Sequence, residues 1–481
     1  MSTRQTIRFY LNGQRHEIRP ESHTQTLLQY LRENLRLSGT KEGCAEGDCG
    51  ACTVAEATLD AQGEVSLNAV NACIRFLPTF DGKAIWTVEG IADGQALHPA
   101  QQSMIDHHGS QCGFCTPGFV MSMYAMYQNG KTRPVREEVL DHLSGNLCRC
   151  TGYRPIIDAA MHMGDYAAQH LDFARIKQQL QALREESQGQ VLHWEEAGQH
   201  YFAPHTAEAL SACYAEHPDA VLLAGGTDVG LWVTKLLMRL DTVIYLGDAL
   251  DLQTLEKRDG YLRIGAAVPL NDGYRALTQE YPEATELWKR FASMPIRNSG
   301  TLVGNVANGS PIGDSAPLLI ALGAVVVLRK GDRRRELPLE SLYLDYRKQD
   351  REPGEWLETL LVPVRQPGLR VATYKLSKRN DQDISAVCGA YALRLDEGRV
   401  AEVRIAHGGM AATSRRAPSA EQALLGQAWE DAAVQQAMQA LAQDYHPMTD
   451  MRASSAYRLK AAQNLLYRFY LESTGAQLTR V

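Results

Sequence analysis

The chain has 481 residues, of which 44% are hydrophobic and 22% are charged, the composition of an ordinary globular protein. This length exceeds what one hydrophobic core supports, so we expect about three or four domains. The net charge of −7 argues against nucleic-acid binding, which needs basic surfaces. The longest apolar run, residues 316–328, is too short to span a bilayer, and the N-terminus lacks an apolar signal core. We therefore expect a cytoplasmic location.

The cysteines are concentrated in the first third of the chain. Eight of the ten lie between residues 44 and 150, and only Cys213 and Cys388 follow. Because cytoplasmic thiols stay reduced, this density argues against a disulfide framework. We expect the cysteine-rich front and the cysteine-poor remainder to carry different chemistries.

The first residues predict a small sheet followed by a helix. Residues 7–18 read as two strands around Asn12-Gly13, a dipeptide that favours a hairpin turn because both residues tolerate a positive φ. The following TLLQYLRENL has apolar residues at helical spacing. A hairpin, a helix and then a cysteine-rich loop predict a β-grasp ferredoxin domain.

The first cysteine set has the spacing of a plant-type [2Fe–2S] ferredoxin. KEGCAEGDCGACTV contains C-x4-C-x2-C, and a fourth cysteine follows in a separate segment. The glycines between them permit a positive φ and bring backbone N–H groups near the sulfurs. A structural zinc site is the alternative, although zinc sites favour paired C-x2-C motifs. The candidate ligands are Cys44, Cys49, Cys52 and Cys73.

The second cysteine set combines C-x2-C with C-x-C. The segments between the two motifs predict helices over residues 119–130, which end on Asn-Gly, and 134–145, which begin with Pro and end with Gly. Two loops at helix ends would then each present two thiols. Since C-x-C is cramped for a tetrahedral ion, iron–sulfur ligation is favoured over the zinc alternative. The candidate ligands are Cys112, Cys115, Cys148 and Cys150.

The remainder of the chain contains two glycine-rich stretches. Residues 167–195 are polar and predict a linker that can be partly helical. An apolar strand then leads into Gly225-Gly226-Thr227-Asp228, and a second glycine-rich stretch covers residues 298–317. Glycines after a strand let backbone N–H groups approach a pyrophosphate, but a tight turn also explains GGTD on its own. Neither stretch is a G-x-G-x-x-G fingerprint.

The last part of the chain predicts a compact α+β domain. VATYKLSK, AYALRLDEG and VRIAHGG read as strands, and SAYRLKAAQNLLYRFYLES reads as a helix. His407 lies in the third of these strands. We expect it to be a packed or capping residue, with catalysis as the alternative.

These motifs together resemble the xanthine oxidase family of molybdenum hydroxylases. CAEGDCGACTV with Cys73, then QCGFCTPG and GNLCRCTGYRPI, resemble the family's iron–sulfur portion, and flavin-type segments follow in the family's order over nearly the whole chain. The resemblance implies that the first four cysteines ligate a ferredoxin-type cluster. It implies that the second four ligate a cluster in a small helical bundle, nearer to the molybdenum.

The resemblance also nominates flavin contacts. LLAGGTDV resembles the flavin-pyrophosphate loop, and FASMPIRNSGTLVGN with SPIGDSAP resembles a second FAD-contact segment. Tyr346-Arg347 matches an aromatic–basic pair near the nicotinamide. Residues 378–383 resemble a loop that influences NAD access, with a solvated surface loop as the alternative. The implied FAD contacts are Leu222, Leu223, Ala224, Gly225, Gly226, Thr227, Asp228, Val229, Phe291, Thr301, Gly304, Asn305, Asp314, Leu357 and Lys375.

We therefore predict a multidomain α+β protein with four domains and one linker. They are a plant-type [2Fe–2S] β-grasp ferredoxin domain at residues 1–85, a helical-bundle [2Fe–2S] domain at 86–166, a linker at 167–195, a two-part α+β FAD-binding domain at 196–365 and a C-terminal flavoprotein α+β domain at 366–481.

The family's chemistry implies electron transfer. Electrons would enter at the second cysteine set, pass to the first set and to FAD, and leave to NAD. No molybdopterin domains follow within the 481 residues, so we expect a molybdopterin-binding large subunit as partner, in a heterotetramer with two copies of each chain. Hypoxanthine or xanthine would be oxidised to urate on that partner, with no catalytic residue for this step on the present chain.

Two alternatives to this function stay open. One is the flavin and iron–sulfur part of another molybdenum hydroxylase, with an aldehyde or an N-heterocycle as substrate. The other is a stand-alone module, either a flavin–iron–sulfur reductase or a zinc-stabilised scaffold.

Overall fold

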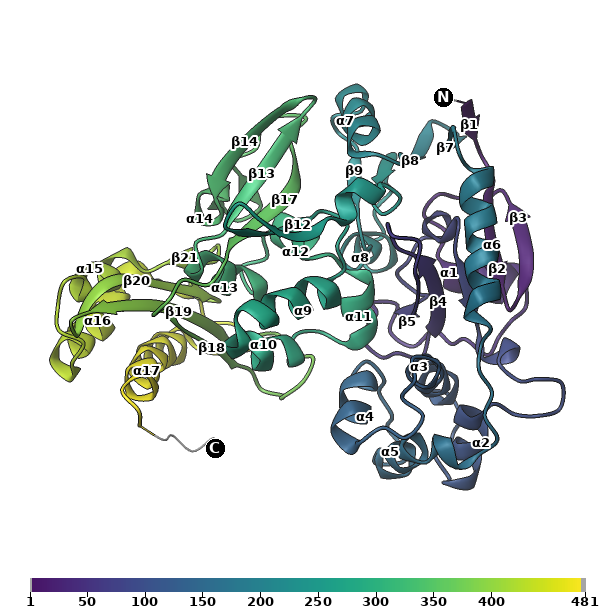
Figure 1. Ribbon diagram of the computed structural model, residues 1–481, viewed down its shortest axis with the longest axis horizontal. Helices are drawn as coiled ribbons and strands as arrows, with labels where there is room; N and C mark the ends of the chain where they lie inside the picture. The colour runs from purple at the N-terminus through teal and green to yellow at the C-terminus, as the bar shows by residue number, and fades with distance from the viewer. Residues whose placement is uncertain (1, 477–481) are drawn as a thin grey trace. The chain divides into compact units, whose positions relative to one another are not determined.

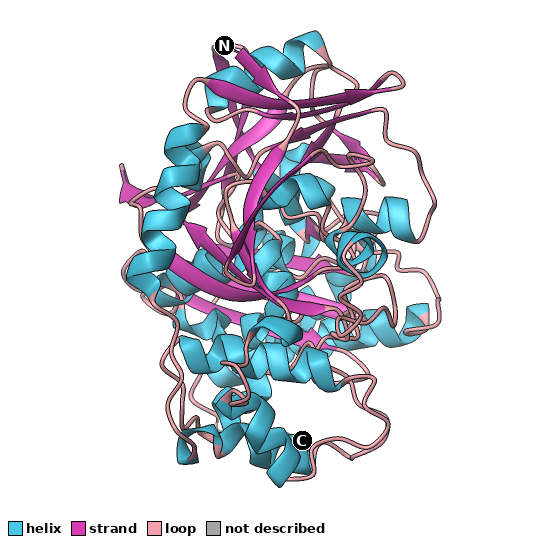
Figure 2. Ribbon diagram, turned by 90° about the vertical axis from the view of Figure 1, so that its right-hand side faces the viewer, coloured by secondary structure: helices cyan, strands magenta, loops and turns pink. Residues whose placement is uncertain are grey.

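The computed structural model describes residues 2–476, which form two compact units (Figure 1). The first unit comprises the residues up to Gln253 together with Pro269–Asn271 and Ala292–Gly300, and the second comprises the intervening residues and those from Thr301 onward. Strands gather into separate sheets with helices against them (Figure 2). The predicted multidomain α+β class is therefore confirmed, whereas the predicted domain limits stay predictions.

The first unit begins with a five-stranded sheet of order β3-β2-β6-β4-β5. The hairpin β2–β3 turns through Asn12 at φ 50° and Gly13 at φ 79°, as the Asn-Gly dipeptide predicts. β2 also pairs in parallel with β6. The strands are β2 (Ile7–Leu11), β3 (Gln14–Ile18), β4 (Thr53–Leu59), β5 (Val65–Asn71) and β6 (Ala84–Trp86).

The helix predicted after this hairpin is confirmed in a modified form. α1 (Leu27–Gln29) continues directly into a π-helical segment, Tyr30–Asn34. It begins at a capping box, in which Thr26 accepts from the Gln29 N–H and the Gln29 side chain accepts from the Thr26 N–H. The cysteine-rich loop follows this helical segment in the chain.

The helical part of the first unit surrounds one buried helix. α3 is buried over nearly its whole length and is covered by the other helices and by the first sheet (Figure 1). No helix within residues 2–476 is both long and apolar enough to cross a membrane. The helices are α2 (Pro99–Asp106), α3 (Thr116–Gln128), α4 (Arg136–His142) and α5 (Arg154–Met161).

The predicted linker contains a packed helix, α6 (Phe173–Glu186). Ile176, Leu180 and Leu183 recur at helical spacing and are buried in the same core as α3. The Arg184 guanidinium donates to the Leu59 carbonyl oxygen at 2.9 Å, which ties the helix to β4. The polar residues that suggested a linker occupy the outer side of this helix.

A second sheet completes the first unit, in the order β1-β7-β8-β10-β9. Its inner side shares a hydrophobic core with the first sheet, where Trp194 and Leu223 lie with Phe9 and Ile74. The elements are β1 (Ser2–Arg4), β7 (Gln190–Glu196), β8 (Gln199–Ala203), β9 (Val221–Leu223), β10 (Thr242–Tyr245), α7 (Ala207–Glu216), α8 (Val229–Thr234) and α11 (Met294–Ser299).

The second unit contains a five-stranded sheet of order β11-β12-β17-β13-β14, with antiparallel neighbours. A short two-stranded sheet lies after β14 in the chain. The elements are β11 (Leu255–Arg258), β12 (Tyr261–Gly265), α9 (Leu270–Glu280), α10 (Thr285–Lys289), α12 (Leu302–Asn308), α13 (Ser315–Ala321), β13 (Val325–Lys330), β14 (Arg333–Pro338), α14 (Leu339–Leu342), β15 (Tyr343–Asp345), β16 (Lys348–Gln349) and β17 (Trp356–Pro363).

The C-terminal part of the second unit is an antiparallel sheet covered by helices. The three predicted strands and the predicted last helix are all confirmed, and the helices pack on the sheet through one hydrophobic core. The elements are β18 (Arg370–Leu376), β19 (Val387–Asp396), β20 (Arg399–Gly408), β21 (Arg415–Arg416), α15 (Pro418–Leu424), α16 (Asp431–Asp444) and α17 (Ser455–Ser473).

Candidate iron–sulfur and flavin sites

The first cysteine set comes together in the first unit. Three cysteines lie on the loop before β4, and Cys73 lies just after β5. Three backbone N–H groups donate to the Cys44 sulfur at 3.4–3.5 Å, those of Glu46, Asp48 and Cys49. Such donors stabilise negative charge on sulfur, and the thiolate is the form that ligates a metal.

Hydrogen bonds among these thiols show how close their sulfurs lie. The Cys49 and Cys73 thiols both donate to the Cys44 sulfur, and these bonds lower the pKa of Cys44. The Cys73 thiol also lowers the pKa of Cys52 by donating to its sulfur, and the Asn71 amide approaches the same sulfur at 3.7 Å. The same bonds raise the pKa of Cys49 and of Cys73, so two of the four sulfurs favour the thiolate and the two donors keep their protons.

The second cysteine set forms two pairs, each with one residue from each motif. Cys112 pairs with Cys150, and Cys115 pairs with Cys148. The Phe114 backbone N–H lowers the pKa of Cys112, and the Cys150 thiol adds to this effect. The two motifs are brought together because α3 begins directly after Cys115 and α5 begins shortly after the second motif.

The arrangement of the eight sulfurs fits two-iron clusters better than single ions. A tetrahedral zinc site with bonds of about 2.3 Å would place its four sulfurs about 3.8 Å apart. Within residues 2–476, however, no three cysteine sulfurs all lie within 4.8 Å of one another. In the second set the sulfurs approach as two pairs, which suits two metals that each take two thiolates, as in a [2Fe–2S] cluster.

The two sulfur sites contact each other directly. The Leu147 N–H donates to the Cys49 carbonyl oxygen at 3.0 Å, one residue from Cys148. The Asn146 amide donates to the Gly50 carbonyl oxygen at 3.1 Å and accepts from the Ser122 hydroxyl at 2.6 Å. Sequence reasoning did not single out Asn146, because only the folded chain brings it to the other loop.

The predicted pyrophosphate loop, residues 222–229, joins β9 to α8 in the first unit. Gly226 has a φ of 73°, which favours glycine. Gly225 has no space for a side chain, because a Cβ there would lie 1.9 Å from the Ser299 carbonyl oxygen. The two glycines thus have separate structural reasons, a close approach of neighbouring backbone at Gly225 and a positive φ at Gly226.

The start of the second predicted FAD segment lies against the same loop. α11 packs on β5 and α4: the Asn298 amide donates to the Ala69 carbonyl oxygen at 2.9 Å, and the Arg297 guanidinium pairs with Asp141 at 2.6 Å. Gly300 follows α11 and packs against Thr227. The first residues of the second glycine-rich stretch, 298–300, are therefore anchored on elements of the first unit.

The pyrophosphate loop and α8 also contact the first sulfur site. A Cβ at Gly230 would lie 2.2 Å from the Ile74 carbonyl oxygen, next to Cys73 in the chain. At the other end of α8, the Lys235 ammonium donates to the Cys44 carbonyl oxygen at 3.0 Å, and the Thr234 hydroxyl donates to the Ala45 carbonyl oxygen at 2.7 Å. The helix after the loop thus touches two parts of the ferredoxin-type site.

In the second unit, two of the predicted FAD contacts form a buried ion pair. The Lys375 ammonium lies 2.6 Å from an Asp314 carboxylate oxygen, and both side chains are almost fully buried. The other Asp314 oxygen accepts from the Ser385 hydroxyl at 2.5 Å, and Lys375 also donates to the Arg290 carbonyl oxygen at 3.2 Å. Sequence reasoning missed Ser385 and Arg290, which complete this network.

The other predicted FAD contacts of the second unit lie on separate helices, loops and strands. Thr301 caps α12 by accepting from the Gly304 N–H at 3.0 Å, and Asn305 lies on the same helix. The Phe291 ring meets the Tyr274 ring edge-on at 5.5 Å. Leu357 is buried in β17, where a bulge shifts the register with β13. Their roles as FAD contacts stay predictions.

The residues that the family resemblance links to NAD lie on exposed turns. Tyr346 and Arg347 form the turn between β15 and β16, where the guanidinium lies 5.4 Å from the Tyr346 ring centre. Within residues 378–383, Arg379 pairs with Asp383 at 3.5 Å. These assignments also stay predictions.

His407 is a packed core residue, as expected. It is fully buried, and its ring is held between the hydroxyl groups of Tyr391 at 2.9 Å and Tyr445 at 3.1 Å. Burial lowers the pKa of His407 to about 3, so the ring is neutral.

Four family descriptions match successive parts of the chain. Residues 9–76 match a 2Fe-2S iron–sulfur cluster binding domain, and residues 87–161 match a [2Fe-2S] binding domain. Residues 195–365 match a FAD binding domain in molybdopterin dehydrogenase, and residues 372–473 match a CO dehydrogenase flavoprotein C-terminal domain.

A solved structure of carbon monoxide dehydrogenase from Hydrogenophaga pseudoflava is similar to about half of this chain. The similarity has 30% sequence identity and a TM-score of 0.53, and it covers 56% of this chain and 94% of the other. The chain belongs to the xanthine oxidase family of molybdenum hydroxylases. It carries two [2Fe–2S] domains and a FAD-binding domain, and it is an electron-transfer part of this family.

Curated relatives in the xanthine oxidase family match almost the whole chain. Xanthine dehydrogenase from Emericella nidulans is 34% identical over 97% of the chain, and xanthine dehydrogenase 1 from Arabidopsis thaliana is 31% identical over 96%. The chain spans 38% and 39% of the lengths of these two relatives.

Proposed function

We propose that this chain is the electron-transfer subunit of a xanthine dehydrogenase. A molybdopterin-binding large subunit would oxidise hypoxanthine and xanthine to urate, and NAD would be the final acceptor. The relatives named xanthine dehydrogenase, which match nearly the full chain, support this substrate and reaction. A heterotetramer and a cytoplasmic location are part of the same proposal.

One observation carries the proposal: three candidate cofactor sites contact one another in series. The second cysteine set reaches the first through the bond from Leu147 to Cys49, and the first set reaches the pyrophosphate loop through Ile74 and Gly230. Iron–sulfur clusters would supply one-electron transfer, and a flavin would supply the conversion to a two-electron hydride donor. A series of this kind suits a protein that links a one-electron chain to NAD.

The chain's own residues would hold and orient these groups. The eight cysteines would supply the thiolates, and backbone N–H groups such as those of Glu46 and Asp48 would stabilise their charge. The close packing at Gly225 and the positive φ at Gly226 would fix the course of the pyrophosphate loop, whose backbone N–H groups would bind the flavin's phosphates. In the second unit, Asp314 and Lys375 are proposed FAD contacts, and their buried ion pair would hold both side chains in fixed positions.

The test is an anaerobic visible spectrum of the protein purified with its natural partner. Hypoxanthine should bleach the flavin and iron–sulfur bands, and NADH should bleach them in a separate sample. Bleaching by NADH but not by hypoxanthine would support the flavin and iron–sulfur assignments and would contradict the proposed purine substrate. A colourless preparation that contains zinc would reject the iron–sulfur assignment itself.

A second candidate is the flavin and iron–sulfur part of a different molybdenum hydroxylase. The 30% identity to the carbon monoxide dehydrogenase chain favours considering it, since that identity lies close to those of the xanthine dehydrogenases. The same spectrum with carbon monoxide, an aldehyde or an N-heterocycle as reductant separates the two candidates. The correct substrate is the one that bleaches the bands while hypoxanthine does not.

A further inference from the structure

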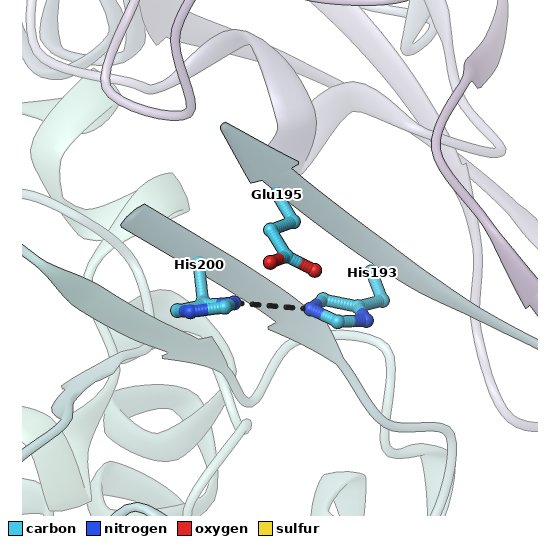
Figure 3. A group of neighbouring side chains, drawn as sticks. All are labelled: His193, Glu195 and His200. Atoms are coloured by element: carbon cyan, nitrogen blue, oxygen red, sulfur yellow. Dashed lines mark hydrogen bonds between the residues drawn. The ribbon is translucent and has the colours of Figure 1, made fainter. Parts of the chain in front are cut away.

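Three potential metal ligands gather on one hairpin of the first unit, away from the cysteines in sequence. His193 and Glu195 lie on β7, and His200 lies on β8 (Figure 3). Their ligand atoms all lie within 4.8 Å of one another, and no other group of three His, Cys, Asp or Glu residues does so in residues 2–476.

The strand geometry explains why these side chains converge. Glu195 and His200 are directly opposite each other in the antiparallel register, and His193 lies two residues before Glu195 on the same face. The alternate residues Trp194 and Tyr201 are buried in the core on the opposite face. One face of the hairpin is thus packed against the core, and the three polar side chains share the other face.

The hairpin turn between β7 and β8 has the geometry of a tight two-residue turn. Ala197 and Gly198 both have a positive φ, 49° and 75°, as a two-residue hairpin turn of the favoured type requires. A short turn of this kind fixes the register of β7 against β8. The opposition of Glu195 and His200 is therefore built into the backbone.

The separation of the two imidazoles suits a shared metal ion. His193 Nε2 and His200 Nδ1 lie 3.3 Å apart. Two nitrogens bound to one tetrahedral zinc ion at about 2.0–2.1 Å would lie about 3.3–3.4 Å from each other. The distance also suits a direct N–H···N hydrogen bond, so the experiment below has to distinguish the two.

We propose that His193, Glu195 and His200 form a binding site for a divalent late transition metal, with zinc as the best fit. Two imidazoles and one carboxylate are a ligand set that zinc uses, and they leave a fourth position for water. Copper and nickel also accept imidazole ligands, but sites of hard oxygen ligands suit calcium and magnesium instead. The site would clamp the two strands of the hairpin together.

The environment of His193 is consistent with ligation. Burial lowers the pKa of His193, and the neighbouring His200 lowers it further. A neutral imidazole is the form that binds a metal. The Glu195 carboxylate is exposed, so it is free to turn toward an ion from the solvent side.

The test measures zinc binding to the tag-free protein with its clusters and flavin in place. The samples are dialysed against zinc near neutral pH, and zinc and iron per chain are measured by mass spectrometry. The wild type should bind one zinc ion more per chain than His200→Ala, with an affinity about 10-fold or more higher. His446→Ala, which removes an exposed histidine elsewhere, should bind like the wild type.

A second variant protects the test against misfolding. Glu195→Gln changes only the charge of an exposed side chain, so it should fold normally and still bind zinc more weakly. An anomalous diffraction peak at the zinc edge between β7 and β8 would place the ion. Zinc that binds equally to the wild type and His200→Ala belongs to the thiols and would overturn the proposal, as would a wild type that takes up no zinc.

Discussion

Gly225 has no room for a side chain, and this constraint leads to the first prediction. An alanine Cβ would lie 1.9 Å from the Ser299 carbonyl oxygen and 2.5 Å from the Gly300 Cα, so the loop backbone has to move. We expect Gly225→Ala to destabilise the fold by about 1–3 kcal/mol and to lower the FAD content. The measurements are FAD released per chain on denaturation and the apparent urea midpoint.

The matched control for this variant is Gly260→Ala. Gly260 has a φ of 80°, but an added Cβ there meets nothing within 4 Å. This variant carries the cost of backbone strain, about 1 kcal/mol, without a clash. It should keep its FAD. Equal FAD content in both variants and in the wild type would remove the loop from the flavin site.

The buried pair of Asp314 and Lys375 gives a second prediction at residue scale. Asp314→Asn would leave the Lys375 ammonium buried beside a neutral amide, and breaking a buried pair in this way costs about 3–5 kcal/mol. The double variant Asp314→Asn, Lys375→Met should recover part of this loss. Urea unfolding measures the free energy of unfolding of both variants. The control is Glu402→Gln, which breaks the exposed ion pair with Arg394 and should change the free energy of unfolding by at most about 1 kcal/mol.

Residue-level prediction from the sequence succeeds where the chemistry is local. The spacing of Cys44, Cys49 and Cys52 was enough to nominate ligands, and the structure does bring their sulfurs together with Cys73. Asn146 was missed, because its role comes from contact with a loop nearly one hundred positions earlier. Contacts between distant segments leave no spacing signal in a single sequence.

At the scale of elements, α6 is the clearest difference from expectation. Leu180 is fully buried on this helix, although the segment was predicted to be a linker that can be partly helical. We expect Leu180→Ala to destabilise the protein by about 2–5 kcal/mol and to increase proteolysis within residues 173–186. Gln178→Ala on the exposed side should change stability by no more than about 0.5 kcal/mol. Equal behaviour of the two variants would support a loose linker.

Elements were predictable where a local pattern specifies them. The Asn12-Gly13 hairpin and the last helix follow from turn chemistry and from apolar spacing. The parallel pairing of β1 with β7 was not predictable, because it joins residues 2–4 to residues 190–192. The π-helical form of Tyr30–Asn34 was also missed, since its apolar spacing resembles that of an α-helix.

At the scale of the whole molecule, the order of contacts between the candidate sites differs from the order of the domains in the sequence. Within the first unit, the segment that carries Cys148 contacts the loop that carries Cys49, and the residue after Cys73 in the same cysteine set contacts Gly230. Along the chain, the matched domain that contains Cys49 comes first, the one that contains Cys148 second and the FAD-binding domain third, so the first domain in the sequence is the middle one in the series of contacts. A cofactor at the second cysteine set could exchange electrons with the flavin only through the first cysteine set. Blocking the second set should therefore stop flavin reduction from the molybdenum side without stopping flavin reduction by NADH.

Cys112→Ser tests this separation. Cys112 is exposed and belongs to the site furthest along the contacts from the pyrophosphate loop, so its loss should disable entry of electrons from the molybdenum side. We expect flavin reduction by hypoxanthine to be abolished while reduction by NADH persists, both followed by anaerobic stopped-flow absorbance. Cys213→Ser, in α7 and outside both cysteine sets, should retain both reactions. If Cys112→Ser still passes purine electrons to the flavin at the wild-type rate, the second cysteine set is not the point of entry.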